Sequence, residues 1–197
     1  MRFVKSFSSA MSILPGGIKF ESGTAVLSDS ADIVDRRSDL AKIFDDLEDL
    51  AQQHSLQDKI SLAFTREGLV MRLSDHALFD LGSAEMSVEA LPLLQKIGVI
   101  ISRTHYLIRI EGHTDNLPIH NAQFQSNWEL STARAVNVLR YFIKNQNIDP
   151  RRLAAEGFSE FRPLVANDCP ENRALNRRVE IIFIHKKSGQ TVIEKIL

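Results

Sequence analysis

Helical and strand-like periodicities alternate along this chain of 197 residues, and that alternation limits the folds open to it. Apolar residues every three or four positions indicate helices, and strict alternation of apolar and polar residues indicates strands. Helices that alternate with strands favour helices packed on a sheet. The predicted elements are, in order, helix Asp35–His54, strands Lys59–Thr65 and Gly68–Leu73, helix Val88–Ser102, strand Tyr106–Glu111, a helix from the Ser126 cap to Asn147, strand Leu153–Gly157, helix Glu171–Asn176 and strand Arg178–His185.

Two details of the pattern predict how the strands join. Arg66-Glu67-Gly68 is typical of a tight turn, so the first two strands are expected to form a hairpin. The last strand, Arg178–His185, has apolar residues on both faces, which favours a central position in the sheet. We therefore expect an α/β (α+β) two-layer sandwich with helices packed on a mixed sheet, preceded by an N-terminal helical and linker extension.

The predicted domain organisation has four parts: a linker segment 1–34, an amphipathic helix 35–57, a folded domain 58–186 and a tail 187–197. The first part includes a short amphipathic stretch, Met1–Ser12, which is compatible with a surface-lying helix or with a frayed terminus. The helix Asp35–His54 carries one apolar stripe and an acidic face. The stripe must be buried either on the domain or on a second copy of the chain.

Composition excludes several classes of function. The net charge of −1 provides no basic field for nucleic acid. The single cysteine, Cys169, excludes an intrachain disulfide framework and a multi-cysteine metal site. No apolar run reaches the roughly 18–20 residues that a membrane helix needs.

The stretch from Glu111 to Arg134 joins a predicted strand to a predicted helix through a polar loop, and Gly112 is expected to end the strand. Asp115 follows the strand end, and Arg134 lies about two turns into a helix whose start carries a capping box, Ser126 and Glu129. A carboxylate attracts an ammonium group, and a guanidinium binds a carboxylate through two hydrogen bonds. The pair therefore suits a zwitterionic, amino-acid-like ligand. The alternative is that the two side chains pair with each other or with local backbone.

Other chemical interpretations of this stretch are weaker. His113, Asp115 and His120 are too loosely spaced to indicate a metal site. Ser131 with His113 and Asp115 lacks the strained turn of a nucleophile elbow, because the serine lies inside a helix. The sequence also has no Gly-rich phosphate loop. We predict no catalytic residue, no metal site and no cofactor.

Four ordered segments are distinctive: GHTDNLPI from Gly112, FQSNWELSTARAVNVL from Phe124, RRLAAEGFSEFRPLVAN from Arg151 and ENRALNRRVEIIF from Glu171. Together they resemble the OmpA-like peptidoglycan-binding domain, and in particular its flagellar motor stator branch of MotB and PomB proteins. The resemblance covers roughly Leu78 to His185.

The resemblance implies a non-catalytic domain that binds the peptide stem of the cell wall. Asp115 matches the family's acidic residue for the ammonium group of diaminopimelate, and Arg134 matches the arginine for its carboxylate. The positions that line or shape the same groove are Thr114, Asn127, Leu130 and Arg177.

The resemblance also implies a location and partners. It implies the periplasmic region of a single-pass inner-membrane protein, a homodimer that holds an ion channel to peptidoglycan. The channel-forming partner would be of the MotA or PomA type and would bind through a membrane helix absent from this chain. Flagellar basal-body ring proteins are further expected partners. The alternatives are an OmpA-like anchor of another envelope or secretion complex and, from a different class, a cell-wall hydrolase.

Overall fold

The computed structural model describes residues 27–53, 56–57 and 59–184, and side chains from residue 39 onward. The predicted Met1–Ser12 helix and the predicted tail lie outside the described residues. Among the described residues, no helix is both long enough and apolar enough to cross a membrane.

Five strands form one mixed sheet in the order β1-β2-β5-β3-β4. Strands β1 and β2 form the predicted hairpin, and β5 lies in the centre as predicted. Among the strand pairs in the described residues, only β3–β4 is parallel. The strands are β1 (Ile60–Phe64), β2 (Gly68–Ser74), β3 (Leu107–His113), β4 (Leu153–Gly157) and β5 (Arg178–Ile184).

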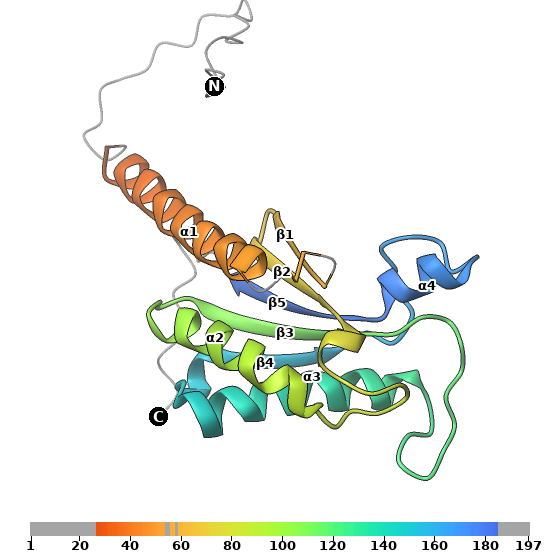
Figure 1. Ribbon diagram of the computed structural model, residues 1–197. Helices are drawn as coiled ribbons and strands as arrows, with labels where there is room; N and C mark the ends of the chain where they lie inside the picture. The colour runs from red at the N-terminus through yellow and green to blue at the C-terminus, as the bar shows by residue number, and fades with distance from the viewer. Residues whose placement is uncertain (1–26, 54–55, 58, 185–197) are drawn as a thin grey trace, which may run out of the picture.

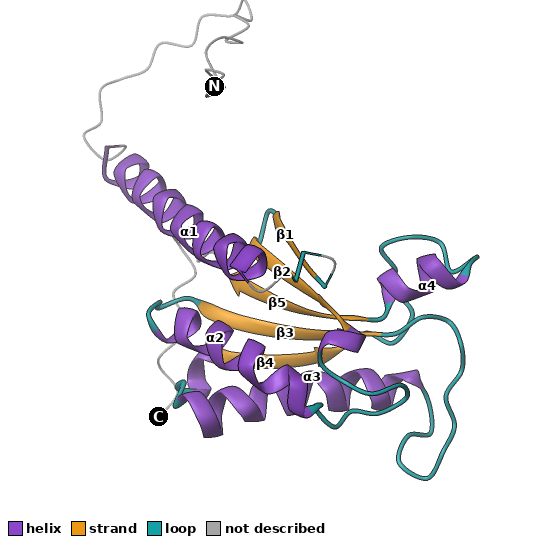
Figure 2. Cartoon of the chain, in the orientation of Figure 1, coloured by secondary structure: helices purple, strands orange, loops and turns teal. Residues whose placement is uncertain are grey.

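The helices are packed against this sheet, which confirms the predicted two-layer architecture (Figure 1). Figure 2 shows α2 and α3 lying along the strands and α1 beside β1 and β2. A short helix, α4, lies beyond one end of the sheet. The helices are α1 (Leu27–Gln53), α2 (Leu91–Ser102), α3 (Asn127–Gln146) and α4 (Pro170–Asn176).

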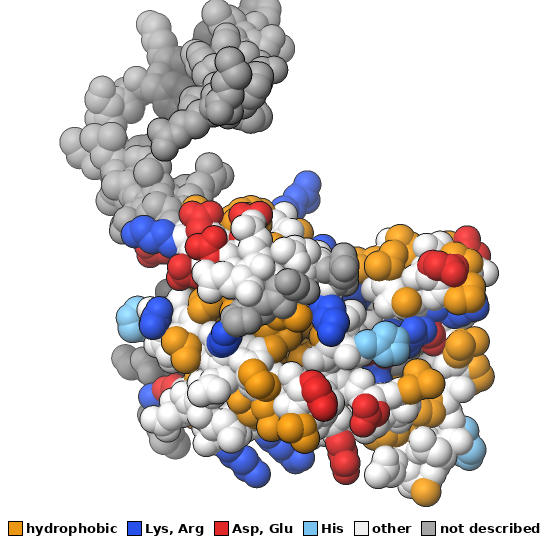
Figure 3. Space-filling view, viewed as in Figure 1, with side chains coloured by type: hydrophobic (Ala, Val, Ile, Leu, Met, Phe, Trp, Pro, Cys, Tyr) orange, Lys and Arg blue, Asp and Glu red, His pale blue; other side chains and the backbone are white. Residues whose placement is uncertain are grey.

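One apolar core joins three helices to one face of the sheet. Every second residue of the strands points into it, including Met71, Ile110 and Ile181. The apolar stripe of α1 is also buried there, so in this structure it packs on the domain. The acidic side chains of α1 that the structure describes, from Asp39 to Asp49, are exposed, as predicted (Figure 3). The stripe residues are Leu40, Ile43, Leu47, Leu50 and Ala51.

Two predicted boundaries were wrong. Helix α1 begins at Leu27 rather than Asp35, so residues 27–34 are helical and not linker. No glycine or proline interrupts the sequence from Leu27 to Gln53, and the helix extends through it. Strand β3 continues through Gly112 to His113, because Gly112 pairs with both Gly157 and Val179.

The strand directions bring three chain segments together at one end of the sheet. The end of β2, the start of β5 and the end of β3 meet there, because both neighbours run antiparallel to β5. The Asp75 amide donates to the Arg177 carbonyl at 3.0 Å, which fixes the segment after β2 against the segment before β5. Side chains just outside these strand ends are therefore close in space although far apart in sequence.

Candidate functional site

Two aspartates and two arginines form a connected network of ion pairs at this end of the sheet. Asp115 Oδ2 accepts a hydrogen bond from Arg177 Nη1 at 2.6 Å. Arg177 Nε lies 3.4 Å from Asp75 Oδ2, and Arg134 Nη1 lies 3.6 Å from the same oxygen. Asp115 and Arg134 thus occupy one site without pairing with each other. We call Asp75, Asp115, Arg134 and Arg177 the ionic quartet.

Arg134 is held deep inside the domain, with only 2% of its surface exposed. Its Nε donates to the Ser83 carbonyl at 2.8 Å, and its guanidinium carbon lies 5.1 Å from the centre of the Phe79 ring. Burial lowers the pKa of Arg134, while the charge of Asp75 opposes that shift. An arginine remains charged in proteins, so its burial requires a nearby carboxylate.

Asp75 is the member of the quartet that the sequence analysis missed. It lies just after β2, is 1% exposed, and faces both arginines. Its other oxygen, Oδ1, has no hydrogen-bond partner among the described residues. Its place two residues past the predicted strand Gly68–Leu73 was only a weak signal, because the sequence does not show which segments lie beside that strand end.

Asp115 is positioned by the loop that follows it. Its Oδ1 accepts from the Leu117 amide at 3.0 Å, a local bond that an aspartate at a turn commonly makes. The Thr114 amide donates to the Ser159 carbonyl, and the Thr114 hydroxyl donates to the Asp115 carbonyl. Thr114 is therefore buried behind Asp115 and supports its backbone.

Asn127 and Leu130 are buried residues of α3 that contact the 114–126 loop. The Asn127 side-chain amide donates to the carbonyls of Asp115 and Leu117, at 3.3 and 3.0 Å, and to the Glu160 carboxylate at 3.0 Å. Leu130 is buried in a small apolar cluster with Ala84 and Phe124, separate from the main core. Both residues tie the 114–126 loop to helix α3.

The start of α3 is fixed by the predicted capping interaction. Ser126 Oγ accepts from the Trp128 amide at 3.2 Å and donates to the Glu129 carboxylate at 2.5 Å. This cap sets where the helix begins and so places Arg134, two turns later, against Asp75.

The residues of the two alternative interpretations, a metal site and a nucleophilic triad, do not form a common site in the structure. Ser131 is fully buried, and its hydroxyl donates to the Trp128 carbonyl and accepts from the Ser159 amide. His113 belongs to the opposite face of the sheet, beside Glu111 and Glu180, and not to the quartet. Among the described residues, His113, Asp115 and His120 do not form a group that could hold a metal ion.

A separate hollow lies at the other end of β3. Its volume is about 440 Å³, and it lies between α1, α2 and the segment before β3, with Lys42, Arg103 and His105 in its lining. It therefore cannot share a ligand with the quartet, which lies past the far end of that strand.

The arrangement can recognise a small zwitterion. The quartet holds two negative and two positive charges, so a ligand with one ammonium and one carboxylate group can enter without leaving an unbalanced charge. Arg177 already contacts both aspartates, so it can release Asp115 to an incoming ammonium group while it stays paired with Asp75.

Comparisons with known proteins relate the chain to cell-wall and motility proteins. The OmpA family model matches residues 78–177. The Motility protein B of Bacillus subtilis is 34% identical over 157 residues, which are 79% of this chain and 60% of that protein. The chain thus spans about three-fifths of that relative's length.

Two solved structures have similar folds. The cell wall anchor of the type VI secretion system (T6SS) from Pseudomonas aeruginosa has a TM-score of 0.63 at 31% identity, and the match covers 69% of this chain and 95% of that one. The periplasmic domain of Helicobacter pylori MotB has a TM-score of 0.61 at 27% identity, with 66% and 84% covered.

Proposed function

The chain belongs to the OmpA family, and we propose that it is a non-catalytic anchor that binds peptidoglycan and holds a flagellar motor stator to the cell wall. The observation that carries this proposal is the ionic quartet, in which Asp115 and Arg134 lie at one site but are paired with Arg177 and Asp75.

The proposed ligand is the side-chain end of diaminopimelate in the peptide stem, which carries one ammonium and one carboxylate group. Asp115 receives the ammonium group in exchange for part of its contact with Arg177. Arg134, fixed by Ser83 and Phe79, presents its guanidinium to the carboxylate. Thr114, Asn127 and Leu130 hold the loop and helix that carry these two side chains.

Binding rather than catalysis is the role that this site supports. Asp75 and Asp115 each form an ion pair with an arginine, and an arginine cannot act as a general acid or base because it remains charged in proteins.

The motor assignment rests on the similarity to Motility protein B, which extends over most of this chain. In this proposal the full-length protein is a single-pass inner-membrane protein whose periplasmic part is the fold described above. It forms a homodimer and binds a channel-forming subunit of the MotA or PomA type, with basal-body ring proteins as further contacts.

A second candidate is an anchor for a different envelope complex. The similar fold of the T6SS cell wall anchor supports it, because the structural match covers 95% of that protein's chain. Deletion of the gene separates the two candidates: lost swimming with normal flagella supports the stator, and lost secretion with normal swimming supports the alternative.

Pull-down by purified peptidoglycan sacculi tests the proposed function. Wild type is expected to sediment with the sacculi, whereas Asp115→Asn and Arg134→Leu should bind at least about tenfold more weakly, since hydrogen bonds between charged groups contribute about 1.5–3 kcal/mol. Arg140→Leu is the matched control, because Arg140 lies exposed on the same helix. Circular dichroism shows whether each variant is folded.

Two outcomes contradict the proposal. If folded Asp115→Asn and wild type bind equally, the quartet is not the binding site. If wild type does not bind sacculi at all, the anchor function itself is wrong.

A further inference from the structure

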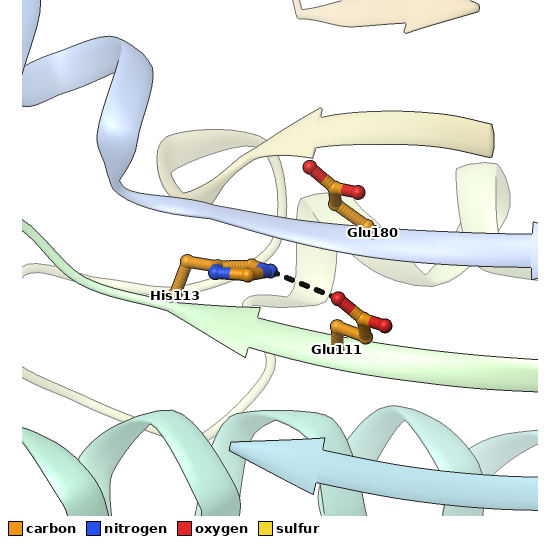
Figure 4. A group of neighbouring side chains, drawn as sticks. All are labelled: Glu111, His113 and Glu180. Atoms are coloured by element: carbon orange, nitrogen blue, oxygen red, sulfur yellow. Dashed lines mark ion pairs between the residues drawn. The ribbon is translucent and has the colours of Figure 1, made fainter. Parts of the chain in front are cut away.

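The sheet face opposite the helices carries a second group of charged side chains, separate from the quartet. Glu111 and His113 project from β3 and Glu180 from the adjacent strand β5 (Figure 4). All three are buried: their exposed fractions are 4%, 1% and 7%. Polar side chains are rarely buried to this extent without a partner, so each needs to be accounted for.

His113 is the member without a satisfactory partner. Neither of its ring nitrogens makes a hydrogen bond among the described residues. Its Nε2 lies 3.4 Å from Glu111 Oε2, and the ring points toward that carboxylate (Figure 4). One donor atom from each of Glu111, His113 and Glu180 lies within 4.8 Å of the other two.

Arginines contact the Oε1 oxygen of each of the two carboxylates. Arg109 Nε lies 2.6 Å from Glu111 Oε1. Arg178 Nε lies 2.7 Å from Glu180 Oε1, and the Arg72 Nε lies 3.1 Å from that same oxygen. Each contact engages Oε1, which orients the carboxylates in the way that outer partners orient metal ligands.

The protonation states suit a cation. Burial lowers the pKa of His113; the contact with Glu111 opposes this shift, and the charge of Arg178 adds to it. A lowered pKa favours the neutral imidazole, which is the form that binds a metal ion. Burial opposes ionisation of Glu111, but its contacts with His113 and Arg109 outweigh that effect and lower its pKa.

The charges around the group balance, because four carboxylates lie near the guanidinium groups of Arg72, Arg109, Arg178 and Arg162. Besides Glu111 and Glu180, the carboxylates of Glu67 and Glu156 contact Arg109. The Phe158 ring stacks on His113 with the ring centres 5.5 Å apart, and the Arg162 guanidinium lies over Phe158. This cover limits the access of water, which strengthens attraction between ion and ligands.

We propose that Glu111, His113 and Glu180 form a binding site for a divalent transition-metal ion, with zinc as the best-suited probe. One imidazole and two carboxylates are ligands that zinc accepts, and water completes a tetrahedron. In such a shell, with bonds of about 2.1 Å, neighbouring donors lie about 3.4 Å apart. The His113–Glu111 pair already has this spacing, so inward rotation of Glu180 closes the site.

The site does not depend on the proposed peptidoglycan function. His113 and Asp115 are two residues apart, but His113 belongs to β3 and faces the side of the sheet away from the helices, whereas Asp115 lies beyond the strand end and pairs with Arg177.

Isothermal titration of the metal-free chain with zinc chloride tests the proposal. Wild type is expected to bind one zinc ion per chain and to show a higher melting temperature with zinc. Glu180→Gln and His113→Gln should each weaken binding at least about tenfold, since even the loss of an outer partner of a metal ligand costs about 10–100-fold in affinity. His105→Ala removes an exposed histidine and should bind as wild type does. Asp115→Asn should also retain zinc binding.

Three results would overturn the proposal: no stoichiometric zinc binding by wild type, unchanged binding by Glu180→Gln, or an equal loss in His105→Ala. Glu180→Gln keeps the size of the side chain, so it remains informative if His113→Gln fails to fold.

Discussion

Replacement of Asp75 by Asn is expected to lower the free energy of unfolding by about 3 kcal/mol, because it removes a buried carboxylate from two arginines. Arg134 is as deeply buried as Asp75, with 2% of each side chain exposed. Arg177 is 19% exposed and keeps Asp115 as a second partner. Most of the loss therefore comes from Arg134, whose charge remains in the interior without an ionic contact.

Urea unfolding of the free protein measures this effect without any ligand. Asp80→Asn is the matched control, since Asp80 lies in the same segment but is exposed. Its free energy of unfolding should stay within about 0.5 kcal/mol of wild type. Equal stability of Asp75→Asn and Asp80→Asn would show that Asp75 does not neutralise Arg134.

Replacement of Gly112 by Ala should destabilise the domain by about 3 kcal/mol or more, at the upper end of the cost of overpacking. A Cβ atom at Gly112 would lie 2.0 Å from the Ser131 carbonyl oxygen. That oxygen belongs to the backbone of α3, so the helix and β3 would have to separate. Because the same helix and strand carry Arg134 and lead to Asp115, the site would be distorted as well.

Gly98→Ala provides the comparison for this prediction. Its Cβ would lie 2.4 Å from Gln146 Cγ, an atom of a flexible side chain that can move away. Alanine is also better than glycine in a helix by about 1 kcal/mol. Thermal unfolding should therefore place Gly98→Ala close to wild type and Gly112→Ala far below it. Similar melting temperatures for the two variants would refute the close approach of β3 and α3.

The sequence predicted those parts of the fold that depend on local periodicity. Apolar residues on both faces of the last strand placed β5 in the centre, and the Ser126 cap defined the start of α3. Local pattern misled at Gly112, where a glycine that usually ends a strand instead allows the strand to pass close to a helix. That requirement comes from tertiary packing and leaves no local signal.

Only part of the site was predicted, because some of its residues are brought together by tertiary packing and not by local sequence pattern. Asp115 and Arg134 were selected from their types and positions and Arg177 from the family resemblance, and the structure brings the three together. Asp75 was missed because its role depends on β2 and β5 being neighbours. The partners of Asp115 and Arg134 likewise follow from strand order. The Glu111, His113 and Glu180 group arises from the pairing of β3 with β5, and neither strand alone indicates it.

The central claim is that the quartet recognises the paired ammonium and carboxylate groups of diaminopimelate. Calorimetric titration with two soluble stem tripeptides tests it most directly, one ending in meso-diaminopimelate and the other in lysine, which lacks the side-chain carboxylate. We predict at least about tenfold tighter binding of the diaminopimelate peptide, because Arg134 gains a charged hydrogen-bonding partner only there. Equal affinity for the two peptides would contradict the account.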